Sequence, residues 1–370
     1  MVASAGVDTA SVSIVPCNGA ARIQTPSPTK ATAGGREWPP LDRTRLPIAA
    51  FVEVQRSQLR DSVNMEKKWI GSLEVPVVGI GCNNFGWRID ANGAAAVVDA
   101  ALDADVNFFD TADIYGEGRS EEFLGHALAK RRNQAIIATK FGMKMDERSV
   151  GARPEYVMRA VENSLRRLAT DRIDLYQLHR PDPAVPIADT LGALDRLVRA
   201  GKVREIGCSN FSAGQIREAE EAARGGARFV SVQNEYNLIN REPEAHALPA
   251  CTRLSLAFLP YFPLANGLLT GKYRLGKPLP AGTRGGDAWG PKVFDERNLQ
   301  VVESLIRFAE SRGHTLLELA ISWLGQRPAV ASVIAGAKSP EQVRANAAAA
   351  GWKMSDAEFE EIDRIAPPPA

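Results

Sequence analysis

Short apolar segments alternate with amphipathic segments along most of the chain. Between the apolar segments, apolar residues recur every three or four positions, as on one face of a helix. The segment 154–168 is an example, with Pro154 suited to a first helical turn and Tyr156, Val157, Ala160 and Val161 in one stripe. We predict strands over 75–81, 106–110, 135–140, 173–179, 203–209, 229–233, 256–261 and 330–336. We predict helices over 93–102, 120–130, 154–168, 187–200, 212–223, 298–312, 315–326 and 355–365.

Continuous apolar strands that alternate with helices are typical of a parallel sheet buried on both faces. Eight such units predict an α/β fold of the (β/α)8 TIM-barrel type. An open, doubly wound parallel sheet is the alternative.

Residues 1–64 lack this alternation. Residues 1–40 are rich in Ala, Ser, Thr, Pro and Gly, and such a segment buries too little apolar surface to offset its ordering entropy. Residues 47–63 predict one short helix. We expect 1–64 to be a disordered or non-native N-terminal extension, with Met65 as the natural start. The barrel would then occupy 65–370, beginning with a β-hairpin cap that turns at Gly71 and Ser72.

Charge and cysteine content narrow the possible functions. The chain has 45 basic and 44 acidic residues, and this balance argues against nucleic acid or an anionic membrane as a partner. The four cysteines form no C-x-x-C pair and lie apart from the histidines in sequence, so we expect neither a metal site nor disulfides. With no apolar run of 18 residues and no signal peptide, we expect a cytoplasmic protein. The oligomeric state stays open.

Ionisable residues stand at the ends of three consecutive predicted strands: Asp110, Lys140 and His179. In a (β/α)8 barrel the carboxyl ends of all strands meet at one face. We therefore expect these three side chains to surround one site.

Tyr115 follows Asp110 by five residues and completes a possible acid catalyst. A tyrosine has a pKa of ~10, and a neighbouring ammonium such as that of Lys140 can lower it by about 1–3. Tyr115 could then donate a proton to a developing alkoxide, while neutral His179 hydrogen-bonds the same oxygen. Because these residues supply no reductant, the site would need a nicotinamide cofactor.

The segments around these residues resemble the aldo-keto reductase family over about residues 65–365. The matching motifs are FFDTADIYGEGRSEEFLG, IIATKFG, DLYQLHRPDP, GKVREIGCSNF, VQNEYN, YFPLANGLLTGKYR and IAGAKSPEQVRAN. The resemblance implies a barrel-shaped, NAD(P)(H)-dependent carbonyl reductase. It implies Tyr115 as the catalytic acid, tuned by Lys140 and Asp110, with His179 orienting the substrate.

The same resemblance implies a cofactor site, which Asp110 borders. Gly81, Cys82 and Asn83 would lie beside the nicotinamide, Ser209, Asn210 and Gln233 would hold its carboxamide, and Tyr261 would stack on its ring. Phe262, Pro263, Leu264, Ala265, Asn266 and Lys272 would line the pyrophosphate, and Arg284, Gly336, Lys338, Gln342 and Asn346 would bind the adenosine end.

Three positions depart from the usual family pattern. Phe262 replaces a common hydroxyl residue and Ala345 replaces a frequent Glu, so each removes one cofactor contact. Lys338 replaces a small residue and adds charge, with Arg284 and Arg344 nearby. We therefore expect NADPH to be favoured, with NADH possible.

The expected function is NADPH-dependent reduction of an aldehyde or ketone by direct hydride transfer. The alternatives are a redox-sensing subunit that binds NADP(H) with little turnover, and an aldolase that forms a Schiff base on Lys140.

Overall fold

A closed barrel of eight parallel strands forms the centre of the structure. The computed structural model describes residues 65–223, 225–278, 280 and 293–369. The strands are β3 (Val78–Gly81), β4 (Phe108–Asp110), β5 (Ile136–Phe141), β6 (Ile173–Leu178), β7 (Val203–Ser209), β8 (Phe229–Glu235), β9 (Ala257–Tyr261) and β10 (Val333–Gly336). They follow chain order around the barrel, and β10 pairs with β3 to close it. The predicted TIM barrel is confirmed, and the open sheet is wrong.

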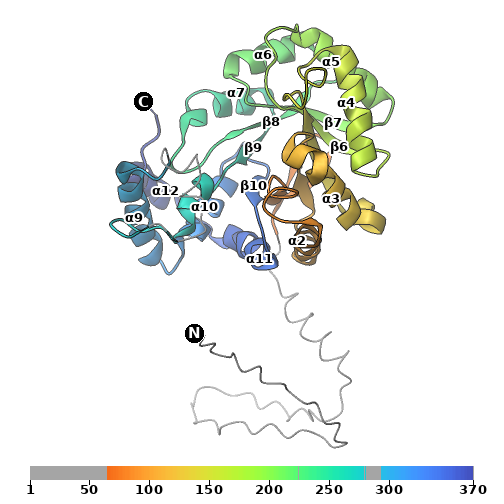
Figure 1. Cartoon of the computed structure of the whole chain (residues 1–370). Helices are drawn as coiled ribbons and strands as arrows, with labels where there is room; N and C mark the ends of the chain where they lie inside the picture. The colour runs from red at the N-terminus through yellow and green to blue at the C-terminus, as the bar shows by residue number, and fades with distance from the viewer. Residues whose placement is uncertain (1–64, 224, 279, 281–292, 370) are drawn as a thin grey trace, which may run out of the picture. The chain divides into compact units, whose positions relative to one another are not determined.

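Helices surround the strands on the outside (Figure 1). They are α2 (Ala91–Asp103), α3 (Arg119–Leu128), α4 (Pro154–Arg167), α5 (Ile187–Arg199), α6 (Ala213–Ala222), α7 (Ala247–Leu254), α9 (Glu296–Glu310), α10 (Leu316–Gly325), α11 (Pro340–Ala348) and α12 (Asp356–Ile365). The sequence pattern missed α7 and α11. The first is short and contains Pro249, which argues against a helix in the sequence, and the second consists largely of alanine and polar residues and has no clear apolar stripe.

The strand predicted over 75–81 is wrong as a single element. It is divided between a hairpin and the barrel: β1 (Lys67–Ile70) pairs with β2 (Leu73–Pro76), and β3 begins only at Val78. Pro76 has no N–H to continue a ladder. Residues 1–64, including the helix predicted over 47–63, lie outside the described residues.

The hairpin closes the end of the barrel where the strands begin. Gly71 turns the chain with φ +56°, and the Ser72 N–H donates to the Glu205 carboxylate at 2.7 Å. Three hairpin side chains and residues inside the barrel share one apolar cluster, which includes Ile70, Leu73, Val75, Phe108, Leu175 and Leu259. The hairpin therefore forms an apolar floor, which confirms the predicted cap.

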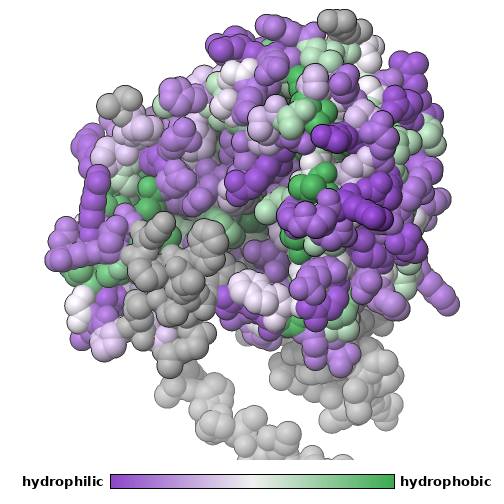
Figure 2. Space-filling view, turned by 45° about the horizontal axis from the view of Figure 1, so that its top comes forward, coloured by the Kyte–Doolittle hydropathy of each residue, from purple (hydrophilic) through white to green (hydrophobic). Residues whose placement is uncertain are grey.

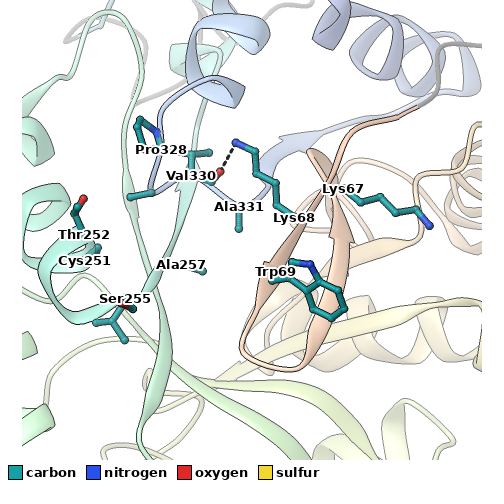
Figure 3. Close-up of a pocket in the computed structure, with 12 residues that line it drawn as sticks. Lys67, Lys68, Trp69, Cys251, Thr252, Ser255, Ala257, Pro328, Val330 and Ala331 are labelled. Atoms are coloured by element: carbon teal, nitrogen blue, oxygen red, sulfur yellow. Dashed lines mark hydrogen bonds between the residues drawn. The ribbon is translucent and has the colours of Figure 1, made fainter.

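A cavity of about 460 Å³ lies between this hairpin and the starts of β9 and β10 (Figure 3). Within it, Lys68 donates to the carbonyl oxygens of Gly325 at 2.6 Å and Val330 at 2.9 Å. In the same view Lys67 points away from Val330. Lys68 thus fixes the hairpin to the chain entering β10. This cavity is at the floor, away from the polar strand ends.

The surface differs sharply from this interior. Figure 2 shows a face that is mostly hydrophilic, with hydrophobic residues in small separate areas. In the described part of the chain, no helix combines the length and the apolar character needed to traverse a bilayer.

The contact between α3 and the end of α4 offers a test of the packing. A Cβ at Gly125 of α3 would lie 2.5 Å from the backbone oxygen of Leu168. We predict that Gly125→Ala lowers the free energy of unfolding by about 1–3 kcal/mol, measured by urea denaturation.

Gly192 of α5 is the matched control, because a Cβ there meets nothing within 4 Å. Gly192→Ala should raise stability by about 0.5–1 kcal/mol. Equal midpoints for Gly125→Ala and the wild type would contradict the predicted close approach.

Candidate active site

A buried ion pair lies where β4 and β5 end. Asp110 is the last residue of β4, and Lys140 is the penultimate residue of β5. The Lys140 Nζ lies 2.6 Å from Asp110 Oδ2 and donates to the Thr111 carbonyl at 2.9 Å. Lys140 is wholly buried, so its charge depends on these partners.

Two glutamines hold the other oxygen of Asp110. Gln177 of β6 donates to Oδ1 at 3.2 Å, and Gln233 of β8 donates to it at 2.8 Å. Sequence reasoning missed Gln177. The signal was available, because Gln177 precedes His179 by two positions and alternate strand residues share a side. Gln233 was expected to hold the carboxamide, whereas here its amide nitrogen binds Asp110.

Tyr115 and His179 lie beside this ion pair. The Lys140 Nζ is 5.1 Å from the centroid of the Tyr115 ring. The rings of Tyr115 and His179 meet edge to face, with centroids 5.8 Å apart at 84°. The structure thus brings together the four side chains that were predicted to form a catalytic group.

Two tight approaches fix the loop that carries Tyr115. Gly116 has φ +58°, and a Cβ there would lie 2.9 Å from the Phe85 carbonyl oxygen. Gly86 has φ +73°, and a Cβ there would lie 2.5 Å from the Arg119 Cβ. The loop after β3 and the loop after β4 therefore pack directly against each other.

Burial sets the protonation states of the group. It raises the pKa of Tyr115 above its ordinary value, because desolvation outweighs the opposing charge of Lys140. The expected lowering of this pKa is therefore wrong, although Lys140 does act in that direction. Burial, with Lys140 and Arg180 nearby, lowers the pKa of His179 to about 2, so its ring is neutral.

Lys140 remains cationic. Desolvation disfavours its charge, but Asp110 and Tyr115 outweigh this effect and raise the pKa of Lys140. An ammonium has no lone pair with which to attack a carbonyl, so this environment disfavours Schiff-base chemistry.

The ends of β7, β8 and β9 join this group through hydrogen bonds. Ser209 donates through its hydroxyl to the Gln233 carbonyl at 2.7 Å. The Asn210 amide donates to the His179 carbonyl at 3.0 Å, and the Tyr261 hydroxyl donates to Asn210 Oδ1 at 2.8 Å. The predicted carboxamide and ring-stacking residues are thus contiguous with the predicted catalytic group.

The segment expected to line a pyrophosphate forms a compact loop after β9. Phe262, Ala265 and Asn266 have φ of +51°, +44° and +57°, with Pro263 and Leu264 between them. The Asn237 amide donates to the Phe262 carbonyl at 3.0 Å. The Lys272 Nζ would lie 3.6 Å from a Cβ at Gly267. A cationic side chain therefore lies over a tight backbone turn.

The ends of β3 and β10 lie side by side. Gly81 pairs with Gly336, and a Cβ at Gly336 would lie 3.5 Å from the Asn83 side-chain oxygen. Next to Gly81, Cys82 is fully buried, and burial raises the pKa of its thiol. The absence of a side chain at Gly81 and Gly336 thus lets the ends of β3 and β10 lie close together.

The remaining described adenosine-end candidates lie on α11 or just before it. The Lys338 N–H donates to the Gln342 side-chain oxygen at 2.8 Å. Asn346 is 4% exposed, and its Nδ2 has no hydrogen-bond partner among the described residues. His179 Nδ1 is likewise unpartnered there. Each of these two buried nitrogen atoms is therefore available to a polar ligand. Arg284 lies outside the described residues.

Comparison with known proteins identifies the family. The sequence model of the aldo/keto reductase family matches residues 77–367. The chain belongs to this family. Membership makes it an NAD(P)H-dependent oxidoreductase, as the resemblance implied.

Three relatives of this aldo/keto reductase each align with it over most of the relative's own length. Aldo-keto reductase YhdN of Bacillus subtilis is 34% identical, over 79% of this chain and 90% of that protein. Aldo-keto reductase yakc [NADP(+)] of Schizosaccharomyces pombe is 34% identical, over 79% and 89%. The solved glycerol dehydrogenase AKR11B4 from Gluconobacter oxydans superposes with a TM-score of 0.72 at 32% identity, covering 83% of this chain and 98% of that one.

The buried ion pair predicts a large loss of stability when its cation is removed. Lys140→Met leaves the Asp110 charge without its ammonium partner, so the free energy of unfolding should fall by about 3–5 kcal/mol in chemical denaturation.

The double variant Lys140→Met/Asp110→Asn should recover part of this loss, because no unpaired charge remains. A single variant as stable as the wild type would mean that Lys140 does not compensate Asp110.

Proposed function

We propose that this chain reduces aldehydes or ketones to alcohols with NADPH and that Tyr115 is the proton donor. The observation that carries the proposal is the position of Lys140, which binds Asp110 at 2.6 Å and lies 5.1 Å from the centre of the Tyr115 ring. One ammonium is thereby linked to a buried carboxylate and to the phenol.

Each of the four side chains has a distinct part in the proposed reaction. A bound reduced nicotinamide would supply hydride to the carbonyl carbon. Neutral His179 would hydrogen-bond the carbonyl oxygen and orient it, and Tyr115 would give its proton to that oxygen as negative charge develops. Lys140 would stabilise the resulting phenolate, and Asp110 keeps Lys140 charged.

The raised pKa of Tyr115 suits a proton donor. At neutral pH the phenol is fully protonated before the reaction. The opposing charge of Lys140 lowers the cost of the phenolate that forms afterwards. Burial and Lys140 therefore act on different stages of the same proton transfer.

Several residues support a dinucleotide site of this kind. Ser209, Asn210, Gln233 and Tyr261 would border the nicotinamide together with Gly81, Cys82 and Asn83. The loop 262–266 with Lys272 would hold the pyrophosphate, and Gly336, Lys338, Gln342 and Asn346 would hold the adenosine end. The NADP(+) in the name of the yeast relative and the cations of Lys338 and Arg344 favour NADPH.

The proton-donor role predicts a selective loss of catalysis. Tyr115→Phe should lower kcat for a model aldehyde by about 100-fold or more, since general acid catalysis contributes about 10²–10⁴-fold. NADPH affinity, measured by fluorescence titration, should stay within a factor of about two because the ring remains.

Three results would separate the alternatives. Full activity of Tyr115→Phe would refute the donor role. Tight NADPH binding by the wild type without turnover on a wide aldehyde panel would favour a redox-sensing subunit. Borohydride trapping of a carbonyl substrate on Lys140 would favour an aldolase.

The proposed preference for NADPH predicts an asymmetric effect at Lys338. Lys338→Ala should weaken NADPH by about tenfold and NADH by less than twofold, because only NADPH carries the 2′-phosphate. Lys130→Ala, an exposed lysine after α3, is the control and should leave both affinities unchanged. Equal weakening of both cofactors would remove Lys338 from a 2′-phosphate site.

A further inference from the structure

A second buried carboxyl lies in the loop that carries Tyr115. Asp113 precedes Tyr115 by two residues and is 1% exposed. Its N–H donates to the Lys140 carbonyl at 3.1 Å, and its Oδ2 accepts a long hydrogen bond of 3.5 Å from the Tyr156 hydroxyl. Its Oδ1 has no hydrogen-bond partner within the described segments. The proposed reaction gives Asp113 no direct part.

Glu121 provides a contrast within the same region. It is also fully buried, yet both of its oxygens are satisfied. Thr139 donates to Oε1 at 2.5 Å, and Arg167 donates to Oε2 at 2.7 Å as an ion pair. Glu121 is therefore placed to carry a charge. Asp113 is not, because an ionised carboxylate with one unpaired buried oxygen is costly.

The groups around Asp113 come from three elements. Glu121 lies on α3, Tyr156 and Arg167 lie on α4, and Tyr176 lies on β6. The Tyr176 hydroxyl is also unpartnered among the residues described. Burial and the charge of Glu121 raise the pKa of Asp113 to about 7, against the opposing effects of Arg167, the Ile114 N–H and Tyr156.

The same surroundings also hold the far end of the Tyr115 loop. A Cβ at Gly118 would lie 2.8 Å from the Arg167 Cδ. At the near end, the backbone of Asp113 binds the backbone of Lys140. A movement of the Asp113 side chain therefore acts on a short segment, 113–118, that contains Tyr115 and is held at both ends.

We propose that Asp113 is a positioning residue that keeps Tyr115 beside Lys140 while its carboxyl is a neutral acid, and that its ionisation displaces the loop and slows the reduction. The displacement follows because the ionised carboxylate needs a hydrogen-bond donor at the buried Oδ1, and the loop must shift either to bring a donor there or to admit water. The kinetic part rests on the proposed function, whereas the ionisation itself does not.

The pH dependence of hydride transfer tests the kinetic part. Tyr115 titrates above its usual range and His179 at about 2, so neither titrates near pH 7. In single-turnover reactions with NADPH, the wild-type rate should fall above pH 7, by roughly tenfold per pH unit if the ionised form is inactive. A primary isotope effect with 4-deuterated NADPH would confirm that hydride transfer is measured.

Three variants assign this fall in rate. Asp113→Asn cannot ionise at this position, so its rate at pH 8.5 should equal its rate at pH 6. Tyr156→Phe should move the midpoint to higher pH, because the phenol stabilises the ionised carboxylate. Glu235→Gln removes another half-buried carboxyl with a raised pKa and should leave the midpoint in place. An unchanged midpoint in Asp113→Asn would overturn the proposal.

Thermal unfolding tests the ionisation without any activity. Asp113 has its pKa raised from 3.8 to about 7 on folding, so the folded state retains a proton that the unfolded state releases. Wild-type stability should therefore fall as the pH rises between these two values. The Tm of Asp113→Asn minus that of the wild type should grow from pH 4.5 to pH 8.

The two measurements separate the possible failures. A Tm difference that is independent of pH would mean that Asp113 does not titrate in this range, and the proposal would fail. A growing Tm difference with unchanged rate profiles would mean that Asp113 ionises without positioning Tyr115, which also overturns it. Full activity of Tyr115→Phe would instead refute the proposed function and leave the Tm result intact.

Discussion

The contact between Lys140 and Asp110 is the interaction on which the rest of the site depends. An ammonium buried in a barrel is tolerable only with a counter-charge at hydrogen-bond distance. Asp110 supplies this charge, and Gln177 and Gln233 satisfy its second oxygen. Four strands, β4, β5, β6 and β8, thus contribute to one electrostatic unit. These contacts hold Lys140 in place, and its positive charge also acts on Tyr115.

The two ends of the barrel differ: apolar packing closes one end, and polar side chains gather at the other. At the floor, the hairpin closes the barrel with apolar side chains, and Lys68 fixes it to the chain entering β10. At the other end, the strands finish in polar residues whose hydrogen bonds connect neighbouring strands and also link β8 to β4 across the barrel. Because the packed hairpin covers the floor, a ligand for the polar group must approach from the opposite end.

Much of this organisation could be predicted from the sequence. The alternation of strands and helices predicts the barrel, and the barrel places Asp110, Lys140 and His179 at one end regardless of their separation in sequence. Gln177 could have been found from strand alternation. Helix α7 could not, because Pro249 obscures its short pattern.

The pKa of Tyr115 was also beyond prediction from sequence. Its direction depends on how much water the packed loops exclude, and this depends on contacts between residues far apart in sequence. The same holds for Asp113. Its motif position is visible in the sequence, but nothing there reveals that one of its oxygens lacks a partner while those of Glu121 are both satisfied.

The close packing of the loops after β3 and β4 has a consequence for how this site can diversify. Gly86 and Gly116 leave no space between the two segments, and the first also carries Trp87, which is 64% exposed. A longer or bulkier first segment would push on the second and move the phenol. Variation that reshapes the rim therefore also moves Tyr115, so selection for a new substrate in this part of the fold must act on both segments at once.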